Sequence, residues 1–147
     1  MTPGINAARK AAVPHTIHEY DHDPASESYG TEAAEKTGVD PARVFKTLVV
    51  AIDGKELVVA IVPVTTMLNM KLIARASGGK KAGMADKQLV ERTTGYVRGG
   101  VSPLGQRKQL TTFIDDSALD FDTIFVSGGR RGLEIELAPR DLALLTK

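Results

Sequence analysis

Two segments in the first half of the chain carry long runs of apolar residues and predict the centre of a β-sheet. Residues 44–52 are β-branched and almost wholly apolar, which is typical of a strand covered on both faces. Asp53 and Gly54 follow as a hairpin turn pair. Residues 56–62 then return as a second apolar strand that ends at Pro63. The pattern predicts an antiparallel pair around which the sheet is built.

Shorter segments on either side of this pair predict further strands. They cover residues 15–22, 80–84, 110–114, 123–127 and 133–137. In the last of them, Glu134 and Glu136 alternate with apolar residues. This alternation predicts a strand with one face on the core and one face in solvent.

Helix signals lie between the strands at irregular intervals. The predicted helices cover residues 3–12, 31–36, 70–77, 87–93 and 140–145. Thr2, Asn69 and Asp86 each stand just before a helix as an N-cap, and Leu72 has the spacing of a core residue. Strands joined by hairpins, with helices placed irregularly, predict a mixed, mainly antiparallel α+β domain and not a wound parallel sheet.

The composition of the chain suits one globular domain over residues 1–147. With 147 residues, of which 42% are hydrophobic, the chain can bury a proper core. It has no cysteine, which excludes disulfides, thiolate metal sites and a cysteine nucleophile of its own. The longest apolar run is broken by charged residues, and the first residues show no secretory pattern. We therefore expect neither a membrane span nor export, which suits a cytoplasmic protein.

The net charge of +1 hides an uneven distribution. Residues 1–66 hold six Lys or Arg against nine Asp or Glu, whereas residues 67–147 hold thirteen against nine. Several of the cations in the second half lie in or beside glycine-containing loops, where they could converge on a phosphate. Because the total charge is small, the sequence predicts a local anion-binding footprint and no long DNA duplex.

The stretch 94–105 predicts a shaped loop. It contains Gly95, Gly99, Gly100, Gly105 and Pro103 within twelve residues, which excludes a regular helix. Glycines allow the backbone to approach a ligand closely, and Arg98 adds a cation in the middle of the loop. The alternative is a surface connection without a ligand.

Two single residues stand out in the predicted strands. Lys46 lies near the start of an apolar strand, where its charge calls for an anion, water or the mouth of a pocket, or for a stem that reaches solvent. Tyr20 lies at the end of a strand and either bonds a ligand or packs. His18 and His22 share a strand face, but no third ligand follows at metal spacing, so we expect no metal site.

Standard catalytic motifs are missing from the sequence. Gly100 and Gly105 have the spacing of a phosphate loop, but Gln106 and Arg107 stand where Lys and Ser or Thr are needed. There is also no Gly-x-Ser-x-Gly elbow and no His/Asp pair spaced for a hydrolase triad. Without a nucleophile, the remaining donors favour binding or electrostatic catalysis.

Three segments of the chain resemble the YbaK/EbsC family of aminoacyl-tRNA deacylases, which is related to the editing insertion of bacterial prolyl-tRNA synthetases. They are Val-Phe-Lys-Thr-Leu at 44–48, Thr-Gly-Tyr-Val-Arg-Gly-Gly-Val-Ser-Pro-Leu-Gly at 94–105 and Ser-Gly-Gly-Arg-Arg-Gly-Leu-Glu-Ile at 127–135. The resemblance runs through essentially the whole chain. It implies a compact α+β domain with a partly closed sheet, cytoplasmic action, no cofactor, the acceptor end of aminoacyl-tRNA as substrate, and prolyl-tRNA synthetase as a partner.

The resemblance also implies roles for individual residues. Lys46 would hold the terminal phosphate or ribose, and Gly100 and Ser102 would present donors to the aminoacyl ester. The residues expected to line the binding site are Tyr20, Phe45, Gly99, Ser127 and Arg130. In the branch that this chain most resembles, cysteine mischarged onto proline tRNA is removed, and the substrate's own thiol attacks the ester.

Two other functions fit the same residues. One is editing of another small amino acid such as alanine, and the other is a module that binds an acceptor end or a nucleotide without chemistry. The sequence leaves open the preferred tRNA, the oligomeric state and the role of Arg98.

Overall fold

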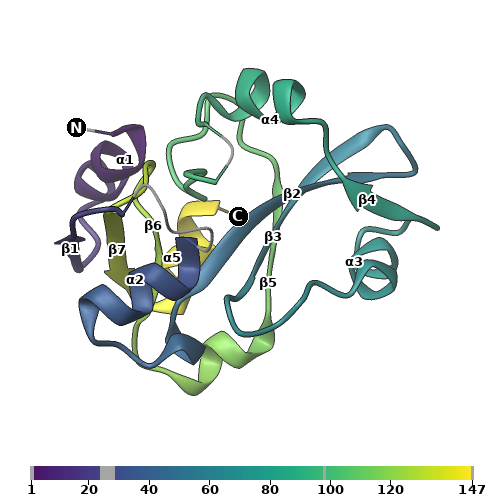
Figure 1. Cartoon of the computed structure of the whole chain (residues 1–147). Coiled ribbons are helices and arrows are strands. Elements are labelled where there is room, and N and C mark those ends of the chain that lie inside the picture. Colours follow the sequence, from purple (N-terminus) through teal and green to yellow (C-terminus); the bar gives the residue numbers. More distant parts are fainter. Residues whose placement is uncertain (1, 24–28, 98, 147) are drawn as a thin grey trace.

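Two β-sheets form the frame of the protein (Figure 1). The computed structural model describes residues 2–23, 29–97 and 99–146. One sheet contains β4 (Ala82–Met84), β2 (Phe45–Ile52), β3 (Glu56–Pro63) and β5 (Thr111–Ile114), side by side in that order. The other contains β1 (His15–Glu19), β7 (Leu133–Leu137) and β6 (Ile124–Ser127), also in that order. The expected α+β class is confirmed, with its strands divided between two sheets.

Five helices and two short 3-10 turns occupy the described residues between the strands. They are α1 (Pro3–Ala11), α2 (Tyr29–Thr37), η1 (Pro41–Arg43), α3 (Met70–Ala76), α4 (Lys87–Thr94), η2 (Asp116–Asp120) and α5 (Pro139–Thr146). The side chains of Thr2, Asn69 and Asp86 accept from the backbone N–H groups of α1, α3 and α4, as the sequence predicts. In the described ranges no helix is long and apolar enough to cross a membrane.

The β2–β3 hairpin is the centre of the four-stranded sheet. The two strands pair antiparallel over their whole length, from Phe45 opposite Pro63 to Ile52 opposite Glu56. Asp53 and Gly54 both have positive φ, at 53° and 70°, which is the backbone of a type I′ turn. β5 is the exception to the antiparallel pattern, because it joins β3 in parallel after a long crossover through α3 and α4.

Two expectations about exposure are wrong. β7 has neighbours on both sides, and Glu134 is only 7% exposed, so this strand does not present a polar face to solvent throughout. Leu72 is 58% exposed, because α3 turns Ile73 and Ala74 toward the sheet instead. In both cases the local pattern identifies the element correctly but not what packs against it.

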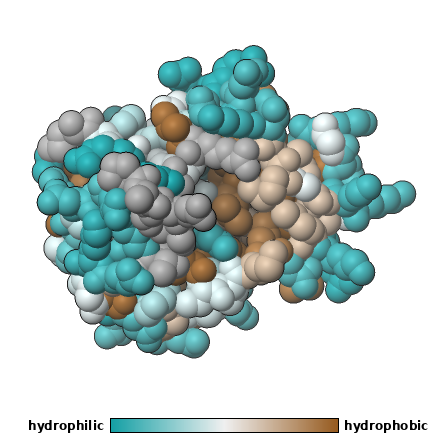
Figure 2. All heavy atoms as spheres, viewed as in Figure 1, coloured by the Kyte–Doolittle hydropathy of each residue, from teal (hydrophilic) through white to brown (hydrophobic). Residues whose placement is uncertain are grey.

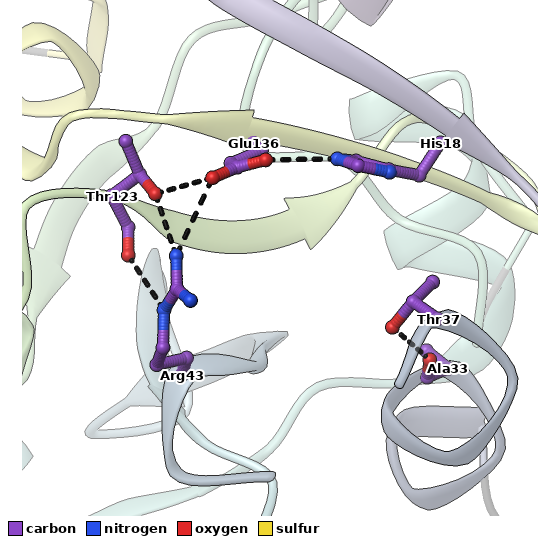
Figure 3. A network of polar contacts seen from close by, with 6 residues as sticks. All are labelled: His18, Ala33, Thr37, Arg43, Thr123 and Glu136. Carbon is purple, nitrogen blue, oxygen red and sulfur yellow. Dashed lines mark hydrogen bonds and ion pairs between the residues drawn. The ribbon is translucent and has the colours of Figure 1, made fainter. Parts of the chain in front are cut away.

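The two sheets meet at Arg43 and Val44. Val44 forms a parallel bridge to Phe125 of β6. Beside it, the guanidinium of Arg43 donates to Thr123 Oγ1 at 2.7 Å (Figure 3). It also lies 5.3 Å from the Phe125 ring centroid. Glu136 accepts from Thr123 Oγ1 at 2.6 Å and lies 2.9 Å from His18 Nε2. These contacts hold η1, β1, β6 and β7 together and partly close the frame.

The hydrogen-bond network of Figure 3 also affects the Glu136 carboxyl. The hydrogen bond from Thr123 outweighs partial burial and, with His18 and Arg43, lowers the pKa of Glu136. The carboxylate therefore stays ionised where the two sheets meet.

The main core lies between the two sheets and also contains part of the glycine-rich loop. Phe45 and Ile61 from one sheet, and Ile135 from the other, pack in the same cluster as Leu142 of α5. Tyr96, Val101 and Leu104 belong to this cluster as well. The loop is thus anchored in the core and is more than a surface connection. A second cluster lies on the other face of the four-stranded sheet, under α3.

Candidate functional site

A cavity of about 600 Å³ opens where the two sheets and the glycine-rich loop meet. The face of the molecule shown in Figure 1 is hollowed near its middle, beside a patch of hydrophobic residues (Figure 2). The lining residues are Tyr20, Val44, Phe45, Lys46, Thr47, Leu48, Val49, Val64, Met84, Ala85, Lys87, Val90, Gly99, Val101, Ser127, Arg130, Arg131 and Glu134. The site thus combines an apolar floor with several charged groups.

The cavity lies along an unpaired edge of β2. β4 pairs only with residues 50–52 of β2. Ala85 N–H donates to Val49 O at 3.1 Å and Asp53 N–H to Lys81 O at 2.7 Å, so the odd-numbered residues of β2 turn their backbone groups toward the β4 side. Thr47 turns its N–H and C=O to the same side, where β4 has ended. A backbone donor and acceptor therefore face the cavity.

The side chain of Thr47 adds a third polar group at this edge. Its Oγ1 atom is buried and makes no hydrogen bond with the described residues. Buried hydroxyls normally have a partner, and leaving one unpaired costs roughly 1–3 kcal/mol. A ligand in the cavity could satisfy this hydroxyl.

Among the described residues, four cations and one carboxyl line the cavity. The cations are Lys46, Lys87, Arg130 and Arg131. Within the described part of the chain, no ion pair involves Lys46, Lys87 or Arg130. Their charge can therefore be directed at an anionic ligand, and a phosphate is the anion that such a group of Lys and Arg binds well.

The carboxyl is Glu134, the second residue of β7. Burial raises its pKa to about 8, because a desolvated carboxylate loses its hydration. Burial also raises the pKa of Tyr20, and the negative charge of Glu134 raises it further. Glu134 can therefore exchange a proton near neutral pH, and in its charged form it would be stabilised by an ammonium group.

Tyr20 is fixed against a second glycine turn, at residues 128–132, which with the loop 94–105 makes the two glycine turns of the site. Its backbone N–H donates to Gly132 O at 2.9 Å. Gly132 has a φ of 87°, and a Cβ atom there would come within 2.6 Å of Tyr20 O. Only glycine allows the turn and the end of β1 to approach this closely. The approach sets Tyr20 beside Ser127, Arg130 and the other residues of the cavity.

The glycine-rich loop is braced from inside. Tyr96 is 4% exposed, and its hydroxyl donates to Leu104 O at 2.6 Å. Burial raises the pKa of Tyr96 to about 12, so the phenol stays protonated as a donor. Gly105 has a φ of 66°, and a Cβ atom there would lie 2.4 Å from the carbonyl of Pro3. The loop is therefore held against α1 in one shape.

Six of the eight site residues expected from the sequence line the cavity. They are Tyr20, Phe45, Lys46, Gly99, Ser127 and Arg130. Gly100 and Ser102 do not line it. Gly100 already donates its N–H to Val97 O at 2.8 Å, and a Cβ atom there would lie 3.1 Å from Arg130 Cα. Ser102 is fully buried, and its Oγ accepts from Leu104 N–H at 3.2 Å.

Gly100 and Ser102 thus support the site without lining the cavity. Gly100 lets the two glycine turns touch, and Ser102 holds the loop in its fold. Arg98 lies outside the described residues. At the cavity itself, the alternation along β2 turns the backbone N–H of Thr47 inward.

Arg131 is held by a chain of polar contacts that ends on α2. Its Nη1 lies 2.7 Å from His22 Nε2, and His22 Nδ1 lies 2.6 Å from Glu32 Oε1. Asp23 N–H donates to Glu32 Oε2 at 2.7 Å. Since Arg131 can only donate, His22 accepts at Nε2 and donates from Nδ1 to the carboxylate.

Glu32 completes this chain as a carboxylate. It is only 4% exposed. Burial would raise the pKa of Glu32, but the hydrogen bonds from His22 and Asp23 and the nearby charges outweigh it, so the pKa is lowered. The carboxylate fixes the imidazole, and the imidazole fixes the Arg131 guanidinium in the cavity wall.

The family follows from comparison with known proteins. A family model described as the aminoacyl-tRNA editing domain matches residues 23–145. The chain belongs to this family. It is 41% identical to EbsC of Enterococcus faecalis (strain ATCC 700802 / V583), a protein proposed to be a Cys-tRNA(Pro)/Cys-tRNA(Cys) deacylase, over 99% of this chain and 88% of EbsC. It is 31% identical to the uncharacterized protein YwhH of Bacillus subtilis (strain 168), over 76% of this chain and 71% of YwhH.

Solved structures share the fold of this editing domain. One is a crystal structure of a proposed trans-editing enzyme for prolyl tRNA synthetase, with a TM-score of 0.85 at 24% identity over 98% of this chain and 89% of that one. Another is the hypothetical protein APE2540, with a TM-score of 0.86 at 23% identity over 99% of this chain and 94% of that one. Two sheets with an irregular set of helices are thus the fold of the editing domain.

Three polar residues of this site were not expected from the sequence. They are Thr47, Lys87 and Glu134. Arg131 was expected only as one of the cations beside glycine-containing loops. Arg131 and Glu134 lie within the segment 127–135 that carries the resemblance, but the alternating pattern placed Glu134 in solvent. Thr47 has no signal of its own, since its importance comes from the end of β4 opposite Val50, three residues along β2. Across the described ranges no three His, Asp or Glu side chains gather in a way that could hold a metal ion.

Proposed function

We propose that this editing domain is an aminoacyl-tRNA deacylase that removes cysteine mischarged onto tRNA(Pro). The observation that carries the proposal is that one cavity, at the open edge of β2, joins Lys46, both glycine turns, Tyr20 and Glu134. The 41% identity to EbsC supports the same substrate class. The cavity offers what an aminoacyl ester needs, namely cations for a phosphate, an apolar floor for a small side chain and a carboxyl for a proton or an amine.

The acceptor end enters with its phosphates toward the cations of the cavity. Lys46 holds the terminal phosphate or the ribose, and Arg130 on the second glycine turn contributes a further phosphate contact. The aminoacyl group then extends toward Tyr20 and Glu134. An α-ammonium group next to Glu134 would offset the cost of charging this buried carboxyl.

The reacting atom comes from the substrate. The cysteinyl thiol gives its proton to Glu134, and the sulfur attacks the ester carbonyl carbon. The bond from that carbon to the ribose oxygen breaks, and the ribose oxygen takes a proton back from Glu134. Water then opens the four-membered thiolactone and releases cysteine. No nucleophile of the protein is used, which suits a chain without cysteine.

The protein contributes proton exchange and charge stabilisation to this route. A thiol has an ordinary pKa of about 8.5. The pKa of Glu134 is raised to about 8, so the proton moves between groups of similar affinity. The N–H of Thr47 and the ammonium of Lys46 stabilise the negative charge on the carbonyl oxygen as the sulfur attacks.

We further propose prolyl-tRNA synthetase as the partner that selects the tRNA. The support comes from the resemblance of the chain and from the fold it shares with a protein described as a trans-editing enzyme for that synthetase.

A panel of charged tRNAs tests the proposed function. The enzyme is expected to release cysteine from Cys-tRNA(Pro) much faster than it releases alanine from Ala-tRNA(Pro) or proline from Pro-tRNA(Pro). Lys46→Ala is expected to lower kcat/KM by about 10²-fold or more, because it removes a positioned cation. Lys55→Ala, in the exposed β2–β3 turn, is the matched control and should change nothing.

The other two functions give different results in the same assay. Faster release of alanine than of cysteine would show that the substrate is alanine. Saturable binding of tRNA without release of any amino acid would show a binding module. Equal deacylation rates for Lys46→Ala and Lys55→Ala would show that Lys46 does not take part in the reaction.

A further inference from the structure

A second cavity, of about 740 Å³, lies on the other face of the four-stranded sheet. It is bounded by α3, by the segment that leads into α3, and by β5 and η2. Its lining residues are Ala42, Ala60, Val62, Pro63, Thr65, Thr66, Met67, Leu68, Asn69, Leu72, Ile73, Ala76, Phe113, Ile114, Asp115, Asp116, Ser117, Asp120 and Phe121. None of these residues lines the candidate active site, so the two cavities are separate. We call this second cavity the α3 groove.

The α3 groove has an apolar floor and apolar sides that reach into solvent. Val62 and Phe113 lie on its floor, from β3 and β5. Met67 is 92% exposed and Leu72 is 58% exposed, although both are large and apolar. Single exposed apolar residues are ordinary, but a hollow lined by several of them marks a surface that binds another molecule.

The charge at the margin of the groove is negative. Asp115, Asp116 and Asp120 line it, and no Lys or Arg is among its described lining residues. Asp115 caps η2 through Ser117 N–H and Ser117 Oγ. No ion pair within the described ranges involves Asp116 or Asp120. The candidate active site has the opposite charge, with four cations against one carboxyl.

This charge selects among the molecules that could cover the groove. Nucleic acid is excluded, because its phosphates would meet three carboxylates. A second copy of the chain, docked symmetrically, would place the same acidic margin against itself, since a two-fold interface uses one patch twice. A protein segment with apolar side chains flanked by Lys or Arg is complementary in both respects.

We propose that the α3 groove binds an amphipathic helix of a protein partner, with apolar side chains on one face and Lys or Arg at its edges. The helix packs its apolar residues against Met67, Leu72 and Phe113, as helices do in hydrophobic grooves. Its cations meet Asp116 and Asp120. The editing domain then holds a protein on one face and tRNA on the other.

Binding of a designed peptide tests this proposal. The probe is a fluorescein-labelled helix of about 18 residues with Leu at i, i+3, i+4 and i+7 and Lys at the flanking positions. The matched probe carries Glu in place of every Lys. Fluorescence anisotropy with the full chain is expected to detect the Lys peptide only. Raising the salt concentration should weaken its binding.

Variants on the protein make the test specific to the groove. Leu72→Ser and the double variant Asp116→Asn, Asp120→Asn should each weaken the binding of the Lys peptide by about tenfold. Leu144→Ser, on α5, is the control, because Leu144 is 66% exposed and lies outside the groove. All three variants should keep the wild-type rate on Cys-tRNA(Pro), since none of these residues lines the candidate active site.

Four outcomes would overturn the proposal. The first is binding of neither peptide, and the second is equal binding of both. The third is an equal effect of Leu72→Ser and Leu144→Ser. The fourth is a dimer in sedimentation that Leu72→Ser dissociates, which would make the groove an interface between copies of this chain.

Discussion

Glu134 is the residue at which stability and function oppose each other most directly. It lies in the central strand of its sheet and is 7% exposed, so its charged form is costly to the folded state. The same burial raises its pKa to about 8, which lets it exchange a proton with a thiol. A buried carboxyl with a raised pKa that lines a cavity is a candidate for the proton exchange of the proposed reaction.

Replacing Glu134 should separate these two effects. Its pKa is higher in the folded state than in the unfolded chain, so the folded state holds the proton more tightly. Stability is therefore lost as the pH rises from about 4.3 to about 8 and is level above that range. Glu134→Gln removes this loss. At about pH 9 its free energy of unfolding, measured by urea titration, should exceed that of wild type by up to a few kcal/mol. At about pH 4 the two proteins should be equally stable.

The variant should also lose most of its deacylase rate, because glutamine cannot take a proton. A constant difference in stability across this pH range would contradict the assignment of the raised pKa to Glu134. An unchanged deacylation rate in Glu134→Gln would show that the Glu134 carboxyl takes no part in the reaction.

His22 gives a second test at the scale of single residues. It connects Arg131, in the cavity wall, to the Glu32 carboxylate. His22→Gln keeps an acceptor for Arg131 and a donor for Glu32, whereas His22→Ala keeps neither. Because a loosely held guanidinium binds phosphate less well, His22→Ala should lower kcat/KM on Cys-tRNA(Pro) by about tenfold.

Glutamine should restore most of that activity. His15→Ala is the control, since His15 is also a half-buried histidine but its Nδ1 lies 2.8 Å from Val13 O and not against Arg131. If the Gln and Ala variants lost the same activity, or if His15→Ala matched them, the contact with Arg131 would not position the guanidinium.

At the scale of elements, the sequence predicted what local signals determine. The caps Thr2, Asn69 and Asp86 placed three helices, and the Asp53-Gly54 pair placed the central hairpin. These signals succeed because each acts within a few residues. Six of the expected site residues also line one cavity. Lys46 and Tyr20 stood out from their places in the predicted strands, whereas the full set came from the resemblance to a family.

What the sequence could not predict depends on contacts between distant segments. The sequence predicted an exposed Glu134 because it alternates with apolar residues. This alternation does not show whether another segment covers the second face of the strand. Thr47 became visible only once β4 was seen to stop opposite Val50. Gly100 was expected to offer its N–H to a ligand, and its bond to Val97 within the same loop uses that donor.

The glycine-rich loop provides a prediction at this scale. Gly105 and Gly38 both have positive φ, at 66° and 72°, but only Gly105 would place a Cβ atom against another chain segment. Gly38→Ala should cost about 1 kcal/mol, the ordinary penalty of that backbone. Gly105→Ala should cost several times more, on the order of 3 kcal/mol, because α1 must move away from the loop.

Thermal unfolding of both variants checks this comparison. Deacylation should fall for Gly105→Ala even at temperatures at which it remains folded, since the loop forms one wall of the cavity. Equal melting temperatures for the two variants would contradict the view that the loop is braced on α1.

At the scale of the whole molecule, the fold separates two surfaces of opposite charge. The two sheets meet at Val44 and enclose the cationic cavity beside the open edge of β2. The α3 groove, on the other face of the four-stranded sheet, is lined by three aspartates. In the functions we propose, the domain would hold the acceptor end of a tRNA in the cavity while a protein helix is bound in the α3 groove.

The central claim is that the protein shapes the ester and the substrate supplies the attacking sulfur. It is tested most directly by single-turnover release of the amino acid from Cys-tRNA(Pro) and from the same tRNA carrying S-methylcysteine. We expect rapid release of cysteine and a rate for S-methylcysteine that is lower by at least about 10³-fold, because the methylated sulfur cannot close on the carbonyl. Equal rates for the two substrates would show that water attacks the ester directly, and the account would be wrong.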